Sequence, residues 1–259
     1  MVVNLIEWSD KFVEAEKQRE GIEPLTEQLE HFTLKDAYSI QLEVIHKKVI
    51  AGDQITGKKI GLTSEAMQKL LKVDEPDYGH LLESMELKNN ELDCSECLKP
   101  RVEAEVAFVM KEDLKGPNVT AEDVINATDY VLASIEVVDS RIKNWNIKLL
   151  DTIADNASSA KYVLGEKKRT LDEIDLPAVH MDFYKNGELI NSGKGSDVLG
   201  NPASCVAWLV NKLADFNIGL KKGEIVLSGA LSSALDAAEG DIFVADFGDT
   251  LGKVELICR

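Results

Sequence analysis

The chain has 259 residues, 44% hydrophobic and 29% charged, which is typical of a folded globular protein with one large domain or two small ones. Its 29 Lys and Arg against 46 Asp and Glu give a net charge of −17, which repels polyanions and argues against nucleic acid as a partner. No apolar run of about 18 residues is present to span a bilayer, and residues 1–20 lack the features of a secretory signal. We therefore expect a cytoplasmic protein without a membrane partner.

Apolar residues recur at three- and four-residue spacing over residues 5–15, which predicts an amphipathic helix. A second helix is expected over residues 33–52, with Thr33 as its N-cap and Gly52 as its stop. Two helices thus precede the first clear strand.

The segment "GKKIGLTS" at residues 57–64 predicts a short strand, in which Lys58 and Lys59 point to opposite faces. A helix is expected to follow over residues 64–73. In "DEPDYG", Asp77 comes shortly before a glycine, and a turn is the simplest structural interpretation of that position.

Cys94 and Cys97 have the spacing of a metal or redox pair, but no second pair and no nearby histidine accompanies them. Four cysteines in a chain of this length do not form a disulfide framework. We interpret the two as unrelated thiols on a polar loop.

The segment "RVEAEVAFVM" at residues 101–110 alternates like a strand and places Glu103 and Glu105 on one face with Ala107 and Val109. A fully solvated face would continue polar. We therefore expect the two carboxylates to look into a partly enclosed site.

The rest of the chain is expected to contain more strand than helix. Because helices gather early and strands late, without regular alternation, the order of elements predicts an α+β fold rather than a doubly wound sheet or a barrel. The expected elements are a helix capped near Thr120, a strand over 131–141, a polar stretch over 151–160, a hairpin turning at Asn186-Gly187, a helix from Pro202, and late strands in "GEIVLSG", "GDIFVADFG" and "KVELIC".

Glu136 lies inside the apolar run "LASIEVV", where an uncompensated charge is costly to bury. An ion pair with Arg141 or Lys59 is one explanation, although it would not account for Glu103 and Glu105 as well. Three convergent carboxylates suit a hard divalent cation such as Mg²⁺ or Mn²⁺, which prefers oxygen ligands.

Two common site types find no support. Only four histidines are present and no serine lies in a G-x-S-x-G turn, which argues against Ser-His-acid catalysis. The glycines of "GKGSDVLG" do not connect a strand to a helix as a phosphate-binding loop would, so we reject a nucleotide site.

Several segments together carry a family resemblance that runs nearly end to end and preserves order and spacing. The chain resembles the 2-keto-4-pentenoate hydratase (2-hydroxypenta-2,4-dienoate hydratase) branch of the fumarylacetoacetate hydrolase superfamily, which also contains the 4-oxalocrotonate decarboxylases. The resemblance implies that superfamily's β-rich α+β fold in a single chain over 1–259, with a helical N-terminal segment at 1–56 and a catalytic core at 57–259. The segments are "GKKIGLTSEAMQKLLKVDEPDYGHLLESM", "PRVEAEVAFV", "IEVVDSRIKNWNIKLLDTIADNASSA" and "GEIVLSGAL".

The resemblance also implies a site. Its metal ligands would be Glu103, Glu105 and Glu136, holding Mg²⁺ or Mn²⁺, and no other cofactor is implied.

The implied catalytic residues are Lys59, Asp77 and Ser158. Lys59 would hold the substrate's carboxylate or enolate, or move a proton, and Asp77 would act as an acid, a base or a group that orients water. Ser158 would contact the substrate, with Ser159 a weaker candidate. His80, close to Asp77 in the sequence, is a further candidate for lining the pocket.

The implied reaction is the metal-dependent addition of water to 2-hydroxypenta-2,4-dienoate, giving 4-hydroxy-2-oxopentanoate in aromatic meta-cleavage catabolism. The alternatives are decarboxylation of 2-oxo-3-hexenedioate (4-oxalocrotonate), a non-catalytic partner subunit and, more distantly, hydrolysis of an acylpyruvate or β-diketone. The stretch with Trp145 and Thr152 favours the hydratase, whereas Asp236 and Asp249 depart from the family pattern and leave the preference for the substrate tail open. A homo-oligomer is implied, and a complex with a pathway enzyme is an open alternative.

Overall fold

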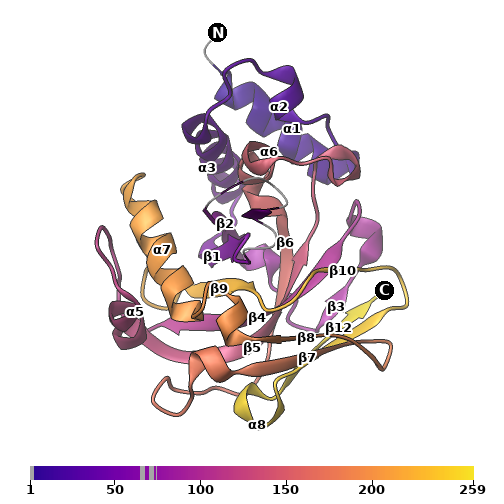
Figure 1. Ribbon diagram of the computed structural model, residues 1–259. Coiled ribbons are helices and arrows are strands. Elements are labelled where there is room, and N and C mark those ends of the chain that lie inside the picture. Colours follow the sequence, from indigo (N-terminus) through magenta and orange to yellow (C-terminus); the bar gives the residue numbers. More distant parts are fainter. Residues whose placement is uncertain (1–2, 65–67, 70–72, 74) are drawn as a thin grey trace.

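The computed structural model describes residues 3–64, 68–69, 73 and 75–259. Helices α1, α2, α3 and α6 gather at one end of the molecule and the β-sheets at the other, with the N-terminus at the helical end (Figure 1). The helices are α1 (Leu5–Gln18), α2 (Leu25–Gln28), α3 (Leu34–Ile50), α5 (Ala121–Ala127), α6 (Leu149–Ala154), α7 (Pro202–Ala214) and α8 (Gly248–Leu251). The strands are β1 (Ile55–Gly61), β2 (Asp77–Leu82), β3 (Glu91–Leu92), β4 (Arg101–Met110), β5 (Thr128–Val138), β6 (Ser159–Leu164), β7 (His180–Lys185), β8 (Glu188–Lys194), β9 (Ile225–Ala230), β10 (Leu235–Asp236), β11 (Ile242–Asp246) and β12 (Lys253–Cys258).

The N-terminal helices form where the sequence pattern predicts them. α1 buries Trp8 and Phe12 on one side, and α3 begins at Thr33, whose side chain accepts a hydrogen bond from the backbone of Asp36 in a capping box. Gly52, at a φ of 109°, follows the end of α3 in a conformation that favours glycine. α3 packs against α1 on one side and α6 on another.

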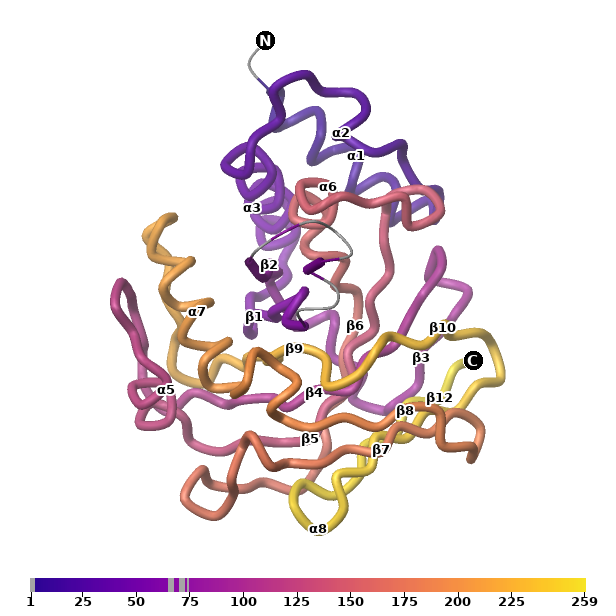
Figure 2. The backbone as a smooth tube through the Cα atoms, viewed as in Figure 1, coloured from indigo at the N-terminus to yellow at the C-terminus, as the bar shows by residue number. Residues whose placement is uncertain are grey.

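Two sheets form the β-rich part of the chain. The larger has the order β2-β1-β9-β4-β5-β6, with β10 paired to the start of β4, and the smaller has the order β3-β12-β11-β7-β8. Strands β11 and β12 contact β5 and so join the two sheets, and Figure 2 shows β4, β5, β7, β8 and β12 in the lower half of the view. The main core joins the two sheets, with Val106 and Phe108 from β4 beside Phe183 and Phe243, and it extends to the N-terminal helices through residues such as Phe12. The α+β prediction is confirmed.

The helix caps and the hairpin turn expected from the sequence are present elsewhere in the chain. Thr120 caps α5 with a capping box, and Asn186 and Gly187 make the turn between β7 and β8 at φ values of 55° and 82°. Asn201 caps α7, which starts at Pro202 as expected. The late strands are β9, β11 and β12, and all four cysteines of the chain are free.

Two segments differ from their expectations. Asp77 is no turn residue: it begins β2, which is buried along its whole length and pairs antiparallel with β1. Residues 151–160, expected only as a polar stretch, form the end of α6, a short turn and the start of β6. Both segments lie where α6 and the following turn contact β2, and such long-range contacts leave no local pattern in the sequence. The helix expected over 64–73 lies largely outside the described residues.

None of the helices within the described ranges is long and apolar enough to cross a membrane.

Candidate metal centre and active site

The register of two neighbouring strands brings three glutamates together. β4 and β5 pair antiparallel with Glu103 directly opposite Glu136, and Glu105 lies two residues further along the same face of β4. One carboxylate oxygen from each of the three lies within 4.8 Å of the other two. Three acidic side chains from two strands therefore converge on one point.

Both faces of β4 are covered. Val106 and Phe108 belong to the main core, whereas Ala107 packs on the opposite face in a second apolar cluster with Leu132 and Leu227. On this second face Glu105 is fully buried and Glu103 partly buried. The partly enclosed surroundings expected from the sequence are those observed.

Each of the two fully buried glutamates has one oxygen that is hydrogen-bonded and one that is not. Glu105 Oε2 accepts the backbone N–H of Gly229 at 2.7 Å, and Glu136 Oε1 accepts the hydroxyl of Ser159 at 2.7 Å. Glu105 Oε1 and Glu136 Oε2 are buried and have no hydrogen-bond partner among the described residues. Buried carboxylate oxygens without hydrogen bonds are costly, and an oxygen-ligated divalent cation at this point would compensate them. The residues present therefore fit such an ion.

Lys59 is the cation closest to this cluster among the described residues. Its Nζ lies 3.3 Å from Glu136 Oε2, and both side chains are buried. Arg141, the other partner considered for Glu136, pairs with Asp155 instead, with Nε 2.6 Å from Oδ1. One ammonium group cannot neutralise three carboxylates, so the ion pair leaves a negative surplus.

Burial and mutual repulsion shift the ionisation of the cluster. Burial raises the pKa of Glu103 to about 7, with Lys59 opposing the shift and Glu136 adding to it. Burial also raises the pKa of Glu105 and of Glu136. For Lys59, burial acts to lower the pKa, but the charges of Glu136 and Asp77 outweigh it and raise the pKa above the usual value. Lys59 is therefore a charged ammonium at neutral pH.

Asp77 lies beside Lys59 on the face of the β1–β2 pair that looks toward the glutamates. It is paired in register with Gly61, and a Cβ at Gly61 would collide with Asp77 Oδ1 and lie 3.3 Å from Lys59 Nζ. The absence of a side chain at Gly61 therefore provides the space that the Asp77 and Lys59 side chains occupy. Burial raises the pKa of Asp77, although Lys59 and a hydrogen bond with Thr152 oppose the shift. Oδ1 has no hydrogen-bond partner in the described part of the chain.

A left-handed turn presents Ser158. Asn156, Ala157 and Ser158 have φ values of 53°, 50° and 55°, a conformation that costs roughly 1–2 kcal/mol for each residue other than glycine. The turn is fixed to β2, because Asn156 Oδ1 accepts the backbone N–H of His80 at 2.8 Å and its Nδ2 donates to the His80 carbonyl at 2.9 Å. Such strain concentrates at functional positions.

The two adjacent serines have separate surroundings. Ser158 Oγ lies 3.4 Å from the hydroxyl of Thr152, the residue that contacts Asp77, so Ser158 belongs to the Asp77 side of the site. Ser159 is the first residue of β6, and its hydroxyl donates a hydrogen bond to Glu136 Oε1. Sequence reasoning ranked Ser159 below Ser158 as a substrate contact and did not identify its bond to a glutamate, because the spacing of adjacent residues does not reveal their partners.

His80, a further candidate for lining this pocket, lies on the other side of the sheet. It is paired in register with Lys58, and both side chains lie on the face of the β1–β2 pair opposite to Lys59 and Asp77. Its Nδ1 lies 3.1 Å from Gln41 Oε1. The expected opposition of Lys58 and Lys59 is observed, since Lys58 pairs with Glu224 at 3.0 Å.

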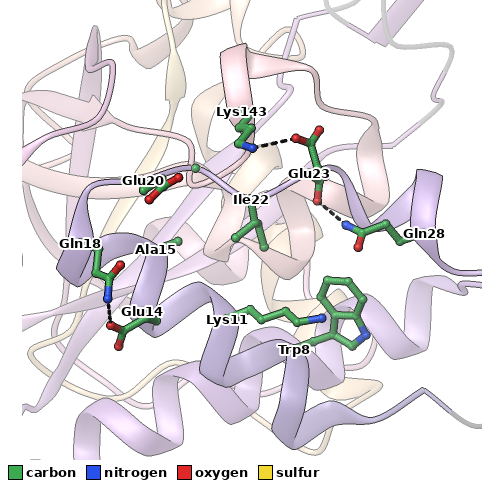
Figure 3. A pocket seen from close by; sticks show the side chains of 11 residues that line it. Trp8, Lys11, Glu14, Ala15, Gln18, Glu20, Ile22, Glu23, Gln28 and Lys143 are labelled. Atoms are coloured by element: carbon green, nitrogen blue, oxygen red, sulfur yellow. Dashed lines mark hydrogen bonds and ion pairs between the residues drawn. The ribbon is translucent and has the colours of Figure 1, made fainter.

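A separate hollow of about 390 Å³ lies beside α1, where Lys11 Nζ sits 3.8 Å from the centre of the Trp8 ring (Figure 3). The ion pair between Lys143 and Glu23 borders it. Its lining includes none of the predicted site residues, so we do not assign the reaction to it.

The two serines give a matched pair of variants. We expect Ser159→Ala to weaken Mg²⁺ binding by about tenfold, because loss of its hydroxyl frees Glu136 to rotate. Ser158→Ala should leave Mg²⁺ affinity unchanged and lower turnover. Calorimetric Mg²⁺ titration of both variants measures this, and equal affinities would contradict the role given to Ser159.

Metal affinity should depend on pH near neutrality. Glu103 in the metal-free protein has a pKa of about 7, so below this pH a proton occupies the group that the cation needs. Mg²⁺ affinity should therefore fall by at least about tenfold per pH unit as the pH drops below that value, because each ligand that carries a proton must lose it before it binds the ion. Mg²⁺ titrations across this range test the direction, and a flat profile would count against Glu103 as a ligand.

Comparison with known proteins assigns the chain to a family. The sequence pattern described as "Fumarylacetoacetate (FAA) hydrolase C-terminal" matches residues 87–256. The 2-hydroxyhexa-2,4-dienoate hydratase of Comamonas testosteroni is 43% identical over 247 residues, covering 91% of this chain and 94% of the relative. The 2-hydroxypent-2,4-dienoate hydratase of Pseudomonas putida is 44% identical over 82% of this chain and 96% of the relative.

A solved structure agrees with the sequence comparisons. The 4-oxalocrotonate decarboxylase of Pseudomonas putida, complexed with magnesium and adipate, superposes with a TM-score of 0.94 at 34% identity, over 98% of this chain and 97% of that one. The resemblance inferred from the motifs is confirmed. The chain therefore belongs to the fumarylacetoacetate hydrolase family, within the branch of the 2-hydroxydienoate hydratases and 4-oxalocrotonate decarboxylase.

Proposed function

We propose that this protein is a metal-dependent hydro-lyase that adds water to 2-hydroxypenta-2,4-dienoate and forms 4-hydroxy-2-oxopentanoate. The observation that carries the proposal is the pair of buried, unbonded oxygens on Glu105 and Glu136 beside the ammonium of Lys59. Hydratase relatives at 43% and 44% identity support the reaction class, and they act on dienoates that differ by one carbon.

Glu103, Glu105 and Glu136 are the proposed ligands of Mg²⁺ or Mn²⁺. When bound, the ion supplies Lewis-acid stabilisation of negative charge on the substrate's C2 oxygen. The magnesium in the related decarboxylase structure supports Mg²⁺ as the first ion to test.

Lys59 is proposed to hold the substrate's carboxylate or enolate oxygen. Its raised pKa keeps it protonated, so it provides a fixed positive charge at the position where the dienolate develops negative charge. In the structure the Lys59 ammonium forms an ion pair with Glu136 Oε2, 3.3 Å away.

Asp77 is proposed to move the protons. Isomerisation takes the hydroxyl proton of the dienol from oxygen and delivers a proton to C5, which gives the 2-oxo-3-enoate. Water then adds its oxygen to C4 while C3 gains a proton. A buried carboxyl with a raised pKa and an unbonded Oδ1 can carry protons in both directions. Thr152 and Ser158, which lie beside it, would orient the group and the water.

Decarboxylation of 2-oxo-3-hexenedioate is the second candidate, supported by the decarboxylase neighbour that is complexed with the diacid adipate. A diacid needs a second cation at its far end. Arg101 lies on the Glu103 face of β4, but its Nε is 2.9 Å from Asp236 Oδ1, and its guanidinium sits 4.6 Å from the centre of the Trp145 ring. Because Asp236 already neutralises Arg101, a substrate with one carboxylate is favoured.

A direct assay separates the candidates. The protein with Mg²⁺ is incubated with each substrate, while loss of dienol absorbance and release of carbon dioxide are recorded. We expect the dienoate to be consumed without carbon dioxide. Consumption of the diacid alone, with carbon dioxide, would replace the hydratase by the decarboxylase. No reaction with either would favour the non-catalytic subunit or a different substrate.

Assembly into a homo-oligomer, and association with another pathway enzyme, are part of the same proposal. The mass of the purified protein by light scattering, alone and with a candidate partner enzyme, tests both.

A further inference from the structure

A second cavity, of about 720 Å³, lies on the reverse face of the β1–β2 pair, away from the glutamates. We call it the reverse cavity. Its apolar wall comes from α3, β1 and the segment between α7 and β9. The apolar residues of this wall are Leu42, Ile45, Val49, Ile55, Ile218 and Leu220.

Eight polar residues also line the cavity: five are exposed at its rim (His46, Asp113, Lys115, Asn217 and Lys221) and three are buried within it (Lys58, His80 and Glu224). Lys58 and His80 are paired in register and share one face, and only 2% and 1% of their surfaces are exposed. Glu224, at the start of β9, is 9% exposed. All three line the cavity, and none takes part in the site proposed above. Polar groups this buried are normally fully hydrogen-bonded.

The acid of this trio has its hydrogen bonds satisfied. Glu224 Oε1 accepts from Lys58 Nζ at 3.0 Å, and Oε2 accepts from the backbone N–H of Lys221 at 3.1 Å. Lys58 has three N–H donors, and among the described residues Glu224 is the one partner bonded to them. The pair is neutral as a unit and has spare donors.

The histidine offers an acceptor. Gln41 Nε2 donates to the carbonyls of Tyr78 at 2.9 Å and Ile153 at 2.8 Å, which fixes the orientation of the amide. Gln41 Oε1 must therefore accept from His80 Nδ1, 3.1 Å away, and Nδ1 carries the proton. Nε2 then has a free lone pair and no hydrogen bond within the described residues. Burial and the charge of Lys58 lower the pKa of His80, so the ring is neutral.

We propose that the reverse cavity binds a neutral, apolar molecule carrying one hydroxyl group. The hydroxyl would donate to His80 Nε2 and accept from Lys58, while the hydrocarbon part would pack against the apolar wall. A carboxylate fits this buried trio poorly, because it lacks a proton to donate and would face Glu224. The exposed lysines at the rim already have partners, since Lys115 donates to Asn217 at 2.8 Å and Lys221 pairs with Asp113 at 2.8 Å. The site is independent of the proposed hydro-lyase reaction, so either can fail alone.

Three probes of similar size test this recognition by calorimetric titration of the Mg²⁺-loaded protein. Phenol has the ring and the donor, anisole has the ring without the donor, and benzoate replaces the hydroxyl by a negative charge. We expect phenol to bind with a dissociation constant of about 1 mM, and anisole and benzoate to bind at least about tenfold more weakly. Equal affinities for phenol and anisole would overturn the proposal.

Location is tested by filling the cavity. Leu42→Trp places a large ring among the wall residues and should abolish phenol binding, whereas Leu189→Trp, at a 54% exposed position on β8, should not. Circular dichroism of both variants checks that each is folded. Phenol binding that survives Leu42→Trp would overturn the location. Absence of saturable binding to the unmodified protein, as expected if a second copy of the chain covers the cavity, would overturn the site itself.

Discussion

Replacing Glu136 by Gln is expected to weaken Mg²⁺ binding by at least about 100-fold and to abolish turnover. The amide keeps the shape of the side chain but removes its negative charge, and Ser159, which donates to Oε1, leaves an N–H₂ group in place of Oε2, the oxygen 3.3 Å from Lys59 Nζ. Glu136 is fully buried, repels Glu105 and pairs with Lys59, so the substitution removes a repulsion and an attraction together, and the stability of the metal-free variant is measured separately from its Mg²⁺ affinity.

Two measurements distinguish loss of a ligand from loss of the fold. Calorimetry gives the Mg²⁺ affinity, and thermal unfolding with and without Mg²⁺ gives the stabilisation by the ion. Glu122→Gln, the same change at an exposed position on α5, is the matched control and should behave like the unmodified protein. An unchanged Mg²⁺ affinity in Glu136→Gln would remove this residue from the ligand set.

Lys59→Met is expected to separate catalysis from metal binding. Without the ammonium, turnover should fall by about 1,000-fold, because the fixed charge that stabilises the dienolate is lost. Mg²⁺ affinity should stay the same or increase, since Lys59 Nζ lies 3.3 Å from Glu136 Oε2 and competes with a cation for that oxygen. A variant that loses both functions together would assign Lys59 a structural role.

The control for this prediction is the same substitution on the surface. Lys253→Met breaks only an exposed ion pair with Asp246, so we expect little change in stability and none in turnover or Mg²⁺ affinity. Steady-state kinetics at saturating Mg²⁺ show whether the loss in Lys59→Met lies in kcat, as transition-state stabilisation requires.

Several features could be predicted because their causes are local. The caps at Thr33 and Thr120, the turn at Asn186-Gly187 and the alternation along β4 each depend on residues within a few positions of one another. The strand pattern also showed that Glu103 and Glu105 share a face. For Glu136 the sequence was compatible with three partners, a divalent metal ion, Arg141 or Lys59, and no local pattern distinguished among them.

Other features depend on contacts between distant segments. β2 was hidden because "DYGHLL" has no alternating pattern and is buried on both faces. The side on which His80 lies could not be predicted, because nearness to Asp77 in the sequence does not reveal strand faces when the strand itself has no recognisable pattern. The partner of Ser159 lies 23 residues away, and no local signal indicates it.

By itself, the sequence determined the α+β composition, most helix ends and turns, and, through its motifs, the family and the residues predicted for the site. The periodicity and capping that encode the local features act over a few residues, and the motifs preserve residue identity. The tertiary structure decided the convergence of the three glutamates, the pairing of Lys59 with Glu136, and the separation of the Lys59 and Lys58 faces. These depend on which strands pair and in what register, and strand register is fixed by burial across the whole sheet rather than by any one segment.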